Sequence, residues 1–503
     1  MAERVDRWHE RLRARVSFSM ISPWLAAWVE EFARNRAVGR APELLAFSIL
    51  QLTLTPSLER AADFATEAVD GRLSTSLTAH RLGTVSGARA FEAFAAEWAK
   101  QDRSIRRAVT LMTVAMDAPA DRRAETLEDA LGAVLEGARR RVVEFSTAIR
   151  GPAMGIYAFG VMLPLALVGL LPVLAASGGG VSMLALAVIY DGLIPAGLAV
   201  SGLWLWARRP AVTDVAFDTE VLKHARRPIL GLGVMAGAAV IAWIGATVVA
   251  PDWVAPIVSP GVGVGVGTIL LLQPVIEAQN RLDRLEERLP DVLTIVGQRL
   301  SEGEPVETTI DAVAKRFEGP VGQLLARGVS RQQRSGDPID RSFLGPDGLL
   351  QSVPSQRTAV ALTLVMSAAE YGPSGGATLL RVGEYLEALI EVEQEARREL
   401  SQTTSTLRQT AIVFAPAIAG VTVALATGMG AVDGSGQALD VASLGQVIGV
   451  YVLLLGVVLP SLAVVLARGF APVRMAYRSG IALSVGAVVY PLSFLAARTL
   501  VYV

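Results

Sequence analysis

Few residues in this chain have a type and spacing that would suit a catalytic or binding site. Asp191 lies inside a long apolar run, where an ionisable side chain is costly and suggests a function. Two acidic pairs have a spacing of four residues: Glu59 with Asp63, and Glu307 with Asp311. At this spacing each pair lies on one face of a helix. The acidic pairs predict either a solvated helix face or a shared contact with a protein partner.

Asp191 has no second carboxylate to work with. The other apolar runs contain no Asp or Glu; they hold Gln273 and Gln446, and Glu277 lies at the end of one run. An ion pathway usually needs a second intramembrane partner, and an intramembrane aspartyl peptidase needs two carboxylates. Asp191 therefore favours a structural role or a contact with a partner over ion transport.

The chain also lacks the usual combinations for catalysis and metal binding. It has 0 Cys and 3 His, and His9, His80 and His224 are far apart in the sequence. No G-x-x-x-x-G-K-[ST] run is present to cradle phosphate, and no paired nucleophile and base can be identified. Lys+Arg 46 against Asp+Glu 47 argues against a nucleic-acid binder. We expect no enzyme, no metal and no cofactor.

The apolar residues predict a membrane protein. The 503 residues are 52% hydrophobic, with a mean hydropathy of +0.45, which is too high for an ordinary soluble chain. Seven apolar runs reach the length of about 20 residues that a helix needs to cross a bilayer. They are residues 154–176, 183–206, 229–250, 255–276, 411–432, 444–467 and 481–501.

Basic residues in the loops predict the orientation of these spans, because they stay on the cytoplasmic side. The loops after the first, third and fifth spans contain no Lys or Arg. The loops after the second and sixth spans carry Arg208, Arg209, Lys223, Arg226 and Arg227, and Arg468, Arg474 and Arg478. This pattern predicts a cytoplasmic N-terminus and an extracytoplasmic C-terminus. The same arginines could also hold anionic lipid head groups.

The spans divide the chain into four parts. Residues 1–150 and 279–408 are expected to be cytoplasmic helical domains, and residues 151–278 and 409–503 hold four and three spans. One helix face in the third part is marked by Leu282, Leu285, Leu289, Val292, Leu293, Val296 and Leu300. Helices should stop at Gly303, Gly319, Gly336, Gly345 and Gly372. No sustained apolar and polar alternation predicts a strand, so the fold class is all-α.

The two cytoplasmic segments resemble each other. Residues 42–77 can be laid on 290–325 without a gap. The identities are Pro42/Pro290, Leu45/Leu293, Leu52/Leu300, Glu59/Glu307, Asp63/Asp311, Gly71/Gly319 and Leu77/Leu325. We therefore predict a duplicated chain, in which a helical bundle is followed by membrane helices, twice. The turns differ, because Ser-Glu-Gly-Glu at 301–304 is matched by Thr-Leu-Thr-Pro at 53–56.

Two further segments have more than one interpretation. Gly261, Gly263, Gly265 and Gly267 alternate with valine inside the fourth span, and their spacing of four favours close helix packing over a ligand loop. The charged helix expected over 377–405 could be a solvated stalk or a lever leading into the fifth span.

The second cytoplasmic segment resembles the type II secretion system F family, the membrane platform proteins of type IV pili, archaella and tight-adherence pili. The resemblance lies in LPDVLTIVGQRLSEGEPVETTIDAVAKRFEGPVGQLL (289–325) and LTLVMSAAEYGPSGGATLLRVGEYL (362–386). It includes a helix break at Ala369-Glu370-Tyr371-Gly372. The resemblance extends over residues 289–432 and, more weakly, over residues 42–176. Length and duplication resemble the archaeal members most.

The resemblance implies a non-enzymatic role in the cytoplasmic membrane. Such proteins present cytoplasmic bundles to a hexameric secretion ATPase and are thought to transmit its movements to pilin or archaellin subunits leaving the bilayer. It makes Glu59, Asp63, Glu307, Asp311, Glu370 and Gly372 candidate partner contacts and Asp191 a candidate pilin contact. A homodimer, with four bundles under the ATPase, is compatible with this role. A multipass secondary transporter is the alternative, since internal repeats and broken membrane helices are common there.

Overall fold

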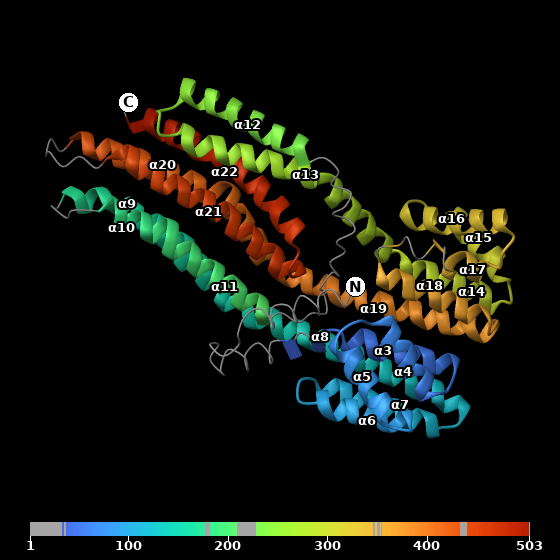
Figure 1. The fold of residues 1–503 in the computed structure, drawn as a ribbon. Helices are drawn as coiled ribbons and strands as arrows, with labels where there is room; N and C mark the ends of the chain where they lie inside the picture. The colour runs from blue at the N-terminus through green and yellow to red at the C-terminus, as the bar shows by residue number, and fades with distance from the viewer. Residues whose placement is uncertain are drawn as a thin grey trace. The chain divides into compact units, whose positions relative to one another are not determined.

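Helices form every regular element in the described part of the chain, and they group into two compact units (Figure 1). The computed structural model describes residues 33–34, 37–176, 182–208, 228–345, 348–349, 353, 355–432 and 440–501. Unit 1 holds the described residues up to Glu144 and those from Asn280 to Glu395. Unit 2 holds the other described residues. No strand occurs within these ranges, so the all-α prediction is confirmed for them.

Unit 1 contains the two segments expected to be cytoplasmic. Its helices from the first segment are α3 (Ala41–Leu54), α4 (Leu58–Ala68), α5 (Arg72–Gly83), α6 (Gly87–Trp98), α7 (Arg103–Asp117) and the start of α8 (Ala120–Tyr157). Those from the second are the end of α13 (Ala255–Glu287), α14 (Leu289–Ser301), α15 (Val306–Arg316), α16 (Pro320–Ser335), α17 (Ile339–Leu344), α18 (Gln356–Ala369) and the start of α19 (Pro373–Gln409).

The sequence explains where several of these helices begin and end. The side chains of Ser57, Asp102 and Ser355 accept hydrogen bonds from the first backbone amides of α4, α7 and α18. The five predicted glycine stops all lie at helix ends. Gly319 and Gly336, at the two ends of α16, have φ of +88° and +73°, a conformation that favours glycine.

A single hydrophobic core joins the two segments within unit 1. Leu44, Leu45 and Phe91 from the first segment belong to the same buried cluster as Val292 and Phe343 from the second. The predicted apolar face is confirmed, because six of its seven residues are buried and Leu282 is half-buried. Residues more than 200 positions apart therefore fold as one body, although the sequence suggested two separate bundles.

The helices of the two segments begin and end at corresponding positions. A shift of 248 residues carries Ala41 onto Leu289, where α3 and α14 begin. The same shift carries Leu58–Ala68 onto Val306–Arg316, which are the bounds of α4 and α15. It also carries Gly71 onto Gly319, and both glycines have positive φ and precede a helix.

Unit 2 contains the helices expected in the membrane. They are the end of α8, the π-helical segment η2 (Ala158–Met162), α9 (Leu163–Ala176), α10 (Met183–Ala187), the π-helical segment η3 (Val188–Leu193), α11 (Ile194–Arg208), α12 (Pro228–Val249), the first part of α13, the end of α19, the π-helical segment η7 (Thr410–Phe414), α20 (Ala415–Val432), α21 (Val441–Arg468) and α22 (Pro472–Val501).

Six helices in the described residues are long and apolar enough to cross a membrane. They contain six of the seven predicted spans, and the remaining span, 229–250, falls on α12, where Gly233–Val249 forms a shorter apolar helix. Large apolar side chains such as Leu184, Leu193 and Ile241 are strongly exposed on unit 2, as expected for surfaces that contact lipid. The protein is a multi-pass membrane protein.

Some predictions fall on residues outside the described ranges. They concern the cytoplasmic N-terminus, since residues 1–32 are not described, the basic loop residues Arg209, Lys223, Arg226 and Arg227, and most of the loops at 177–181 and 433–439.

Candidate functional site

The first acidic pair has partners within unit 1. The carboxylate of Glu59 accepts a 2.7 Å hydrogen bond from the backbone amide of Gly87, the first residue of α6. The Ser57 hydroxyl donates to the other oxygen over 3.0 Å. The Gly87 hydrogen bond is the largest reason that the pKa of Glu59 lies below its ordinary value. Asp63 is exposed and lies 3.7 Å from Nε of Arg81. Glu59 thus caps a helix, and its availability to a partner is reduced.

The second acidic pair is more open. Glu307 is exposed, and its carboxylate has no hydrogen bond or ion pair within the described residues. Asp311 is half-buried and forms an ion pair of 2.5 Å with Nζ of Lys315, four residues on. Glu59 and Glu307 occupy matching positions of the proposed repeat, yet only Glu307 presents a free carboxylate.

The predicted helix break lies where the sequence placed it. α18 ends at Ala369, and Gly372 takes φ of +58° before α19 begins at Pro373. Glu370 and Tyr371 are both exposed at this corner. The corner therefore presents a carboxylate and an aromatic ring to solvent, and the partner contact expected for Glu370 and Gly372 stays a prediction.

A partly buried ionic cluster joins the two segments of unit 1, and the sequence did not reveal it. One terminal nitrogen of Arg357 lies 3.0 Å from a carboxylate oxygen of Glu43 and 3.0 Å from one of Glu393. The other lies 3.8 Å from Glu286, which also accepts a 2.6 Å hydrogen bond from Ser355. Burial alone would lower the pKa of Arg357, but Glu393, Glu43 and Glu286 outweigh it and raise that pKa. Arg357 is therefore held as a cation.

The sequence contained one local indication of Arg357, a charged residue within an otherwise uncharged helix. Arg357 is the one charged residue in α18, whose other residues are small, apolar or uncharged. Its three carboxylates come from α3, α13 and α19, and no local pattern connects them. A second long-range contact lies nearby, because the hydroxyl of Tyr385 donates a 3.0 Å hydrogen bond to the carbonyl oxygen of Pro42. These contacts fix α3 to α18 and α19.

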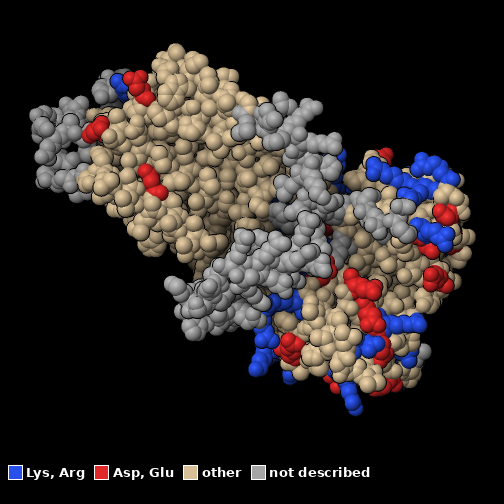
Figure 2. Space-filling model, in the orientation of Figure 1, with Lys and Arg blue, Asp and Glu red and all other residues tan. Residues whose placement is uncertain are grey.

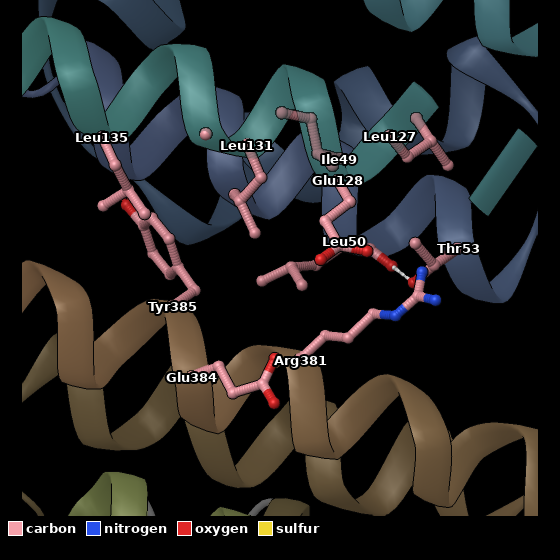
Figure 3. Close-up of a pocket in the computed structure, with 11 residues that line it drawn as sticks. Ile49, Leu50, Thr53, Leu127, Glu128, Leu131, Leu135, Arg381, Glu384 and Tyr385 are labelled. Carbon is pink, nitrogen blue, oxygen red and sulfur yellow. Dashed lines mark hydrogen bonds between the residues drawn. The ribbon is translucent and has the colours of Figure 1, made fainter. Parts of the chain in front are cut away.

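A cavity of about 180 Å³ in unit 1 is lined by α3, α8 and α19 (Figure 3). Its apolar lining includes Ile49, Leu50, Leu127, Leu131 and Leu135. Figure 3 shows Arg381 extending from α19 toward Thr53, whose hydroxyl donates a 2.7 Å hydrogen bond to the carbonyl oxygen of Leu50.

Two carboxylates, those of Glu128 and Glu384, also line this cavity. Both glutamates are exposed, and Arg381 is half-buried. Such a cavity can hold an apolar side chain and pair with a charged one. It brings together none of the predicted site residues.

Asp191 lies in the π-helical segment η3. Short π-helical segments are frequent at functional sites. One of its carboxylate oxygens is buried and has no hydrogen-bond partner within the described residues. The adjacent Tyr190 is buried, donates a 2.7 Å hydrogen bond to the carbonyl oxygen of Pro164 and packs edge-on against Tyr451. The backbone around Asp191 is thus fixed, and one of its oxygens can accept a donor.

The glycine stripe of the fourth span is explained by helix packing, as predicted. A Cβ atom at Gly265 would lie 2.6 Å from the carbonyl oxygen of Gly480 on α22. A Cβ atom at Gly263 would lie 2.7 Å from the Cβ atom of Ala239 on α12. The stripe lets α13 approach two neighbouring helices of unit 2 closely.

No group of three or more Asp, Glu or His side chains in the described residues is arranged to hold a metal ion. Comparisons with protein-family models, with curated proteins and with solved structures gave no match.

Proposed function

We propose that this chain is a platform in the cytoplasmic membrane for assembling type IV pilus-like surface filaments. In this role it couples a hexameric cytoplasmic ATPase to pilin or archaellin subunits and carries out no chemistry of its own. The observation that carries the proposal is the matching order of helices in the two segments of unit 1, with α3, α4 and α5 at the same spacing as α14, α15 and α16. It supports the predicted duplication of the chain, the feature that, together with length, resembles the archaeal members of the F family most.

Unit 1 has properties that a coupling body needs. Its two segments share one hydrophobic core and are fixed together by the Arg357 cluster, so a force applied to one segment is transmitted to the other. The exposed Glu307 and the corner at Glu370 offer polar groups to a soluble partner. These features support a scaffold role.

Imaging of surface filaments in cells that lack the chain tests the proposal. We expect filaments to be lost, processed pilins to remain in the membrane, and the intact chain to restore both. Unchanged filaments would contradict the proposal.

The alternative function, a secondary transporter, is favoured by one observation: an oxygen of Asp191 is buried and has no hydrogen-bond partner within the described residues. It predicts a solute-uptake defect in the same cells and in an Asp191→Asn variant.

The proposed orientation has a separate test, because the chain contains 0 Cys and single cysteines can be labelled without background. Leu500 is 80% exposed near the C-terminal end of α22, and Lys100 is exposed in unit 1. A membrane-impermeant maleimide should label Leu500→Cys in intact cells. It should label Lys100→Cys only after the cells are opened. The reverse pattern would show that the orientation is inverted.

A further inference from the structure

Helix α16 of unit 1 carries a row of positive charge. Its 16 residues contain Arg327, Arg331 and Arg334 and no Asp or Glu. Spacings of four and three place these three arginines, the α16 arginine stripe, along one face of the helix over about 10 Å. Figure 2 shows Lys and Arg side chains gathered over α15 and α16 on the visible face.

The stripe has no charge partner among the described residues. Arg327 and Arg334 are exposed and Arg331 is half-buried, and their guanidinium groups form no hydrogen bond or ion pair within the described residues. Two nearby cations do have partners, because Lys315 pairs with Asp311 and Arg341 pairs with Asp337. The helix dipole favours a cation in the last turn and so accounts for Arg334, but Arg327 lies in the middle of α16. Like charges at a spacing of four destabilise an isolated helix.

The corresponding helix of the first segment lacks such a stripe. The shift of 248 residues places Ala79, Gly83 and Ser86 at the positions of the three arginines. Both arginines of α5 interact within the protein, Arg81 with Asp63 over 3.7 Å and Arg72 through other contacts. The corresponding helix α5 therefore does not share the stripe.

The surroundings of the stripe favour a protein partner over a membrane surface. Helices that lie on membranes combine basic residues with exposed large apolar side chains that enter the bilayer. No large apolar side chain of α14, α15 or α16 is strongly exposed. A row of guanidinium groups without apolar neighbours matches a surface rich in carboxylates, because guanidinium and carboxylate groups pair with two parallel hydrogen bonds.

We infer that the α16 arginine stripe binds an acidic surface of the soluble ATPase, an inference that rests on the proposed function. The stripe makes recognition by the two segments unequal, so that the second segment binds the ATPase electrostatically. Such contacts increase the association rate and weaken as salt screens the charges.

The test measures binding of the purified ATPase to the full-length chain in nanodiscs of neutral lipid, at about 0.1 M salt, where charges are screened beyond about 10 Å. The triple variant R327E/R331E/R334E should bind at least about tenfold more weakly than the wild type, and the wild type should weaken as salt is raised. The matched control is R103E/R106E/R107E on α7, which reverses three exposed arginines elsewhere in unit 1. It should bind within about twofold of the wild type. Thermal unfolding checks that both variants are folded.

The outcomes separate this inference from the proposed function. Equal binding by the stripe variant and the wild type would overturn the inference while leaving the platform role intact. Equal losses in both variants would also overturn it, since the effect would then be one of net charge. If the wild-type chain fails to bind the ATPase, the inference is wrong, and filament imaging in cells lacking the chain then decides whether the platform role fails with it.

Discussion

The hydroxyl group of Tyr451 donates a 2.7 Å hydrogen bond to the carbonyl oxygen of Gly160, four residues before Pro164. Proline has no amide hydrogen, so Pro164 cannot donate the hydrogen bond that the carbonyl oxygen four residues earlier accepts in an α-helix. The tyrosine on α21 provides a donor at that place. A proline inside a membrane helix is thus tolerated here through a side chain from another helix of unit 2.

Replacing Tyr451 with phenylalanine should reduce the stability of the protein. The carbonyl oxygen of Gly160 would lose a buried donor, which costs about 1–3 kcal/mol. Thermal unfolding of the full-length chain in detergent measures the loss. Pro164→Ala restores an amide hydrogen, so Tyr451→Phe should cost less in that background. Equal costs in both backgrounds would contradict the explanation, and Tyr371→Phe, at an exposed ring, is the control.

Removing the Arg357 guanidinium should be more damaging. Arg357→Met would leave the carboxylates of Glu43, Glu286 and Glu393 without their shared cation. Breaking a fully buried ion pair from one side costs about 3–5 kcal/mol. Because Glu43 and Glu286 are partly exposed, the loss here should fall below that range and above the cost of breaking a surface pair. The exposed pair of Arg341 and Asp337 provides the control, because Arg341→Met should cost about 0–1 kcal/mol. Similar losses in thermal stability for the two variants would show that the cluster contributes little.

The pKa of Glu59 predicts a dependence of stability on pH. Its folded pKa lies below the ordinary value of 4.5, so the folded state favours the ionised form. The resulting stabilisation is complete above that ordinary value and is lost as the pH falls through the folded pKa. The gap in unfolding temperature between the wild type and Glu59→Gln should therefore narrow on acidification below about pH 4.5. A temperature gap that stays constant with pH would contradict the prediction. Glu92→Gln, on the exposed face of α6, is the control, and the same narrowing in that variant would also contradict it.

Close packing of α13 predicts a position-dependent effect of leucine. Gly265→Leu would place side-chain atoms against Ser484 and Gly480 of α22, and such overpacking costs about 1–3 kcal/mol. The same substitution at Gly237, where a Cβ atom would meet nothing within 4 Å, should be nearly neutral. Detergent-solubilised protein can be compared by thermal unfolding. Equal tolerance at the two positions would show that α13 and α22 are not closely packed.

Features of the fold that depend on residues close together in the sequence could be predicted, whereas those that depend on residues far apart could not. The spans, the face from Leu285 to Leu300 and the stops at Gly319 and Gly336 follow local patterns, and the structure contains them. The joining of the two segments into one core was not predicted, because tertiary contacts decide it. Tyr385 and Pro42 are separated by 343 positions.

The candidate site was less predictable than the fold. A spacing of four correctly placed Glu59 and Asp63 on α4, but only the structure reveals that Glu59 caps α6. Arg357 gave one local clue, a lone charge in an apolar helix, while its three partners could not be inferred. The π-helical segments around Asp191 and at 410–414 were also not predicted, because an extra residue in a helical turn leaves no compositional pattern.

The π-helical segment η7 sets the rotational phase of the helix that follows it. A π-helical turn acts as one inserted residue, and one residue corresponds to about 100° of rotation around a helix. With that insertion present, Ala415, Ala419 and Val423 form a buried row on α20. Deleting a single residue from η7 would let an ordinary α-helix form, and the row would then rotate away from its neighbours. A one-residue deletion is harmless in many loops, but in η7 it would change which face of α20 is directed toward its neighbours.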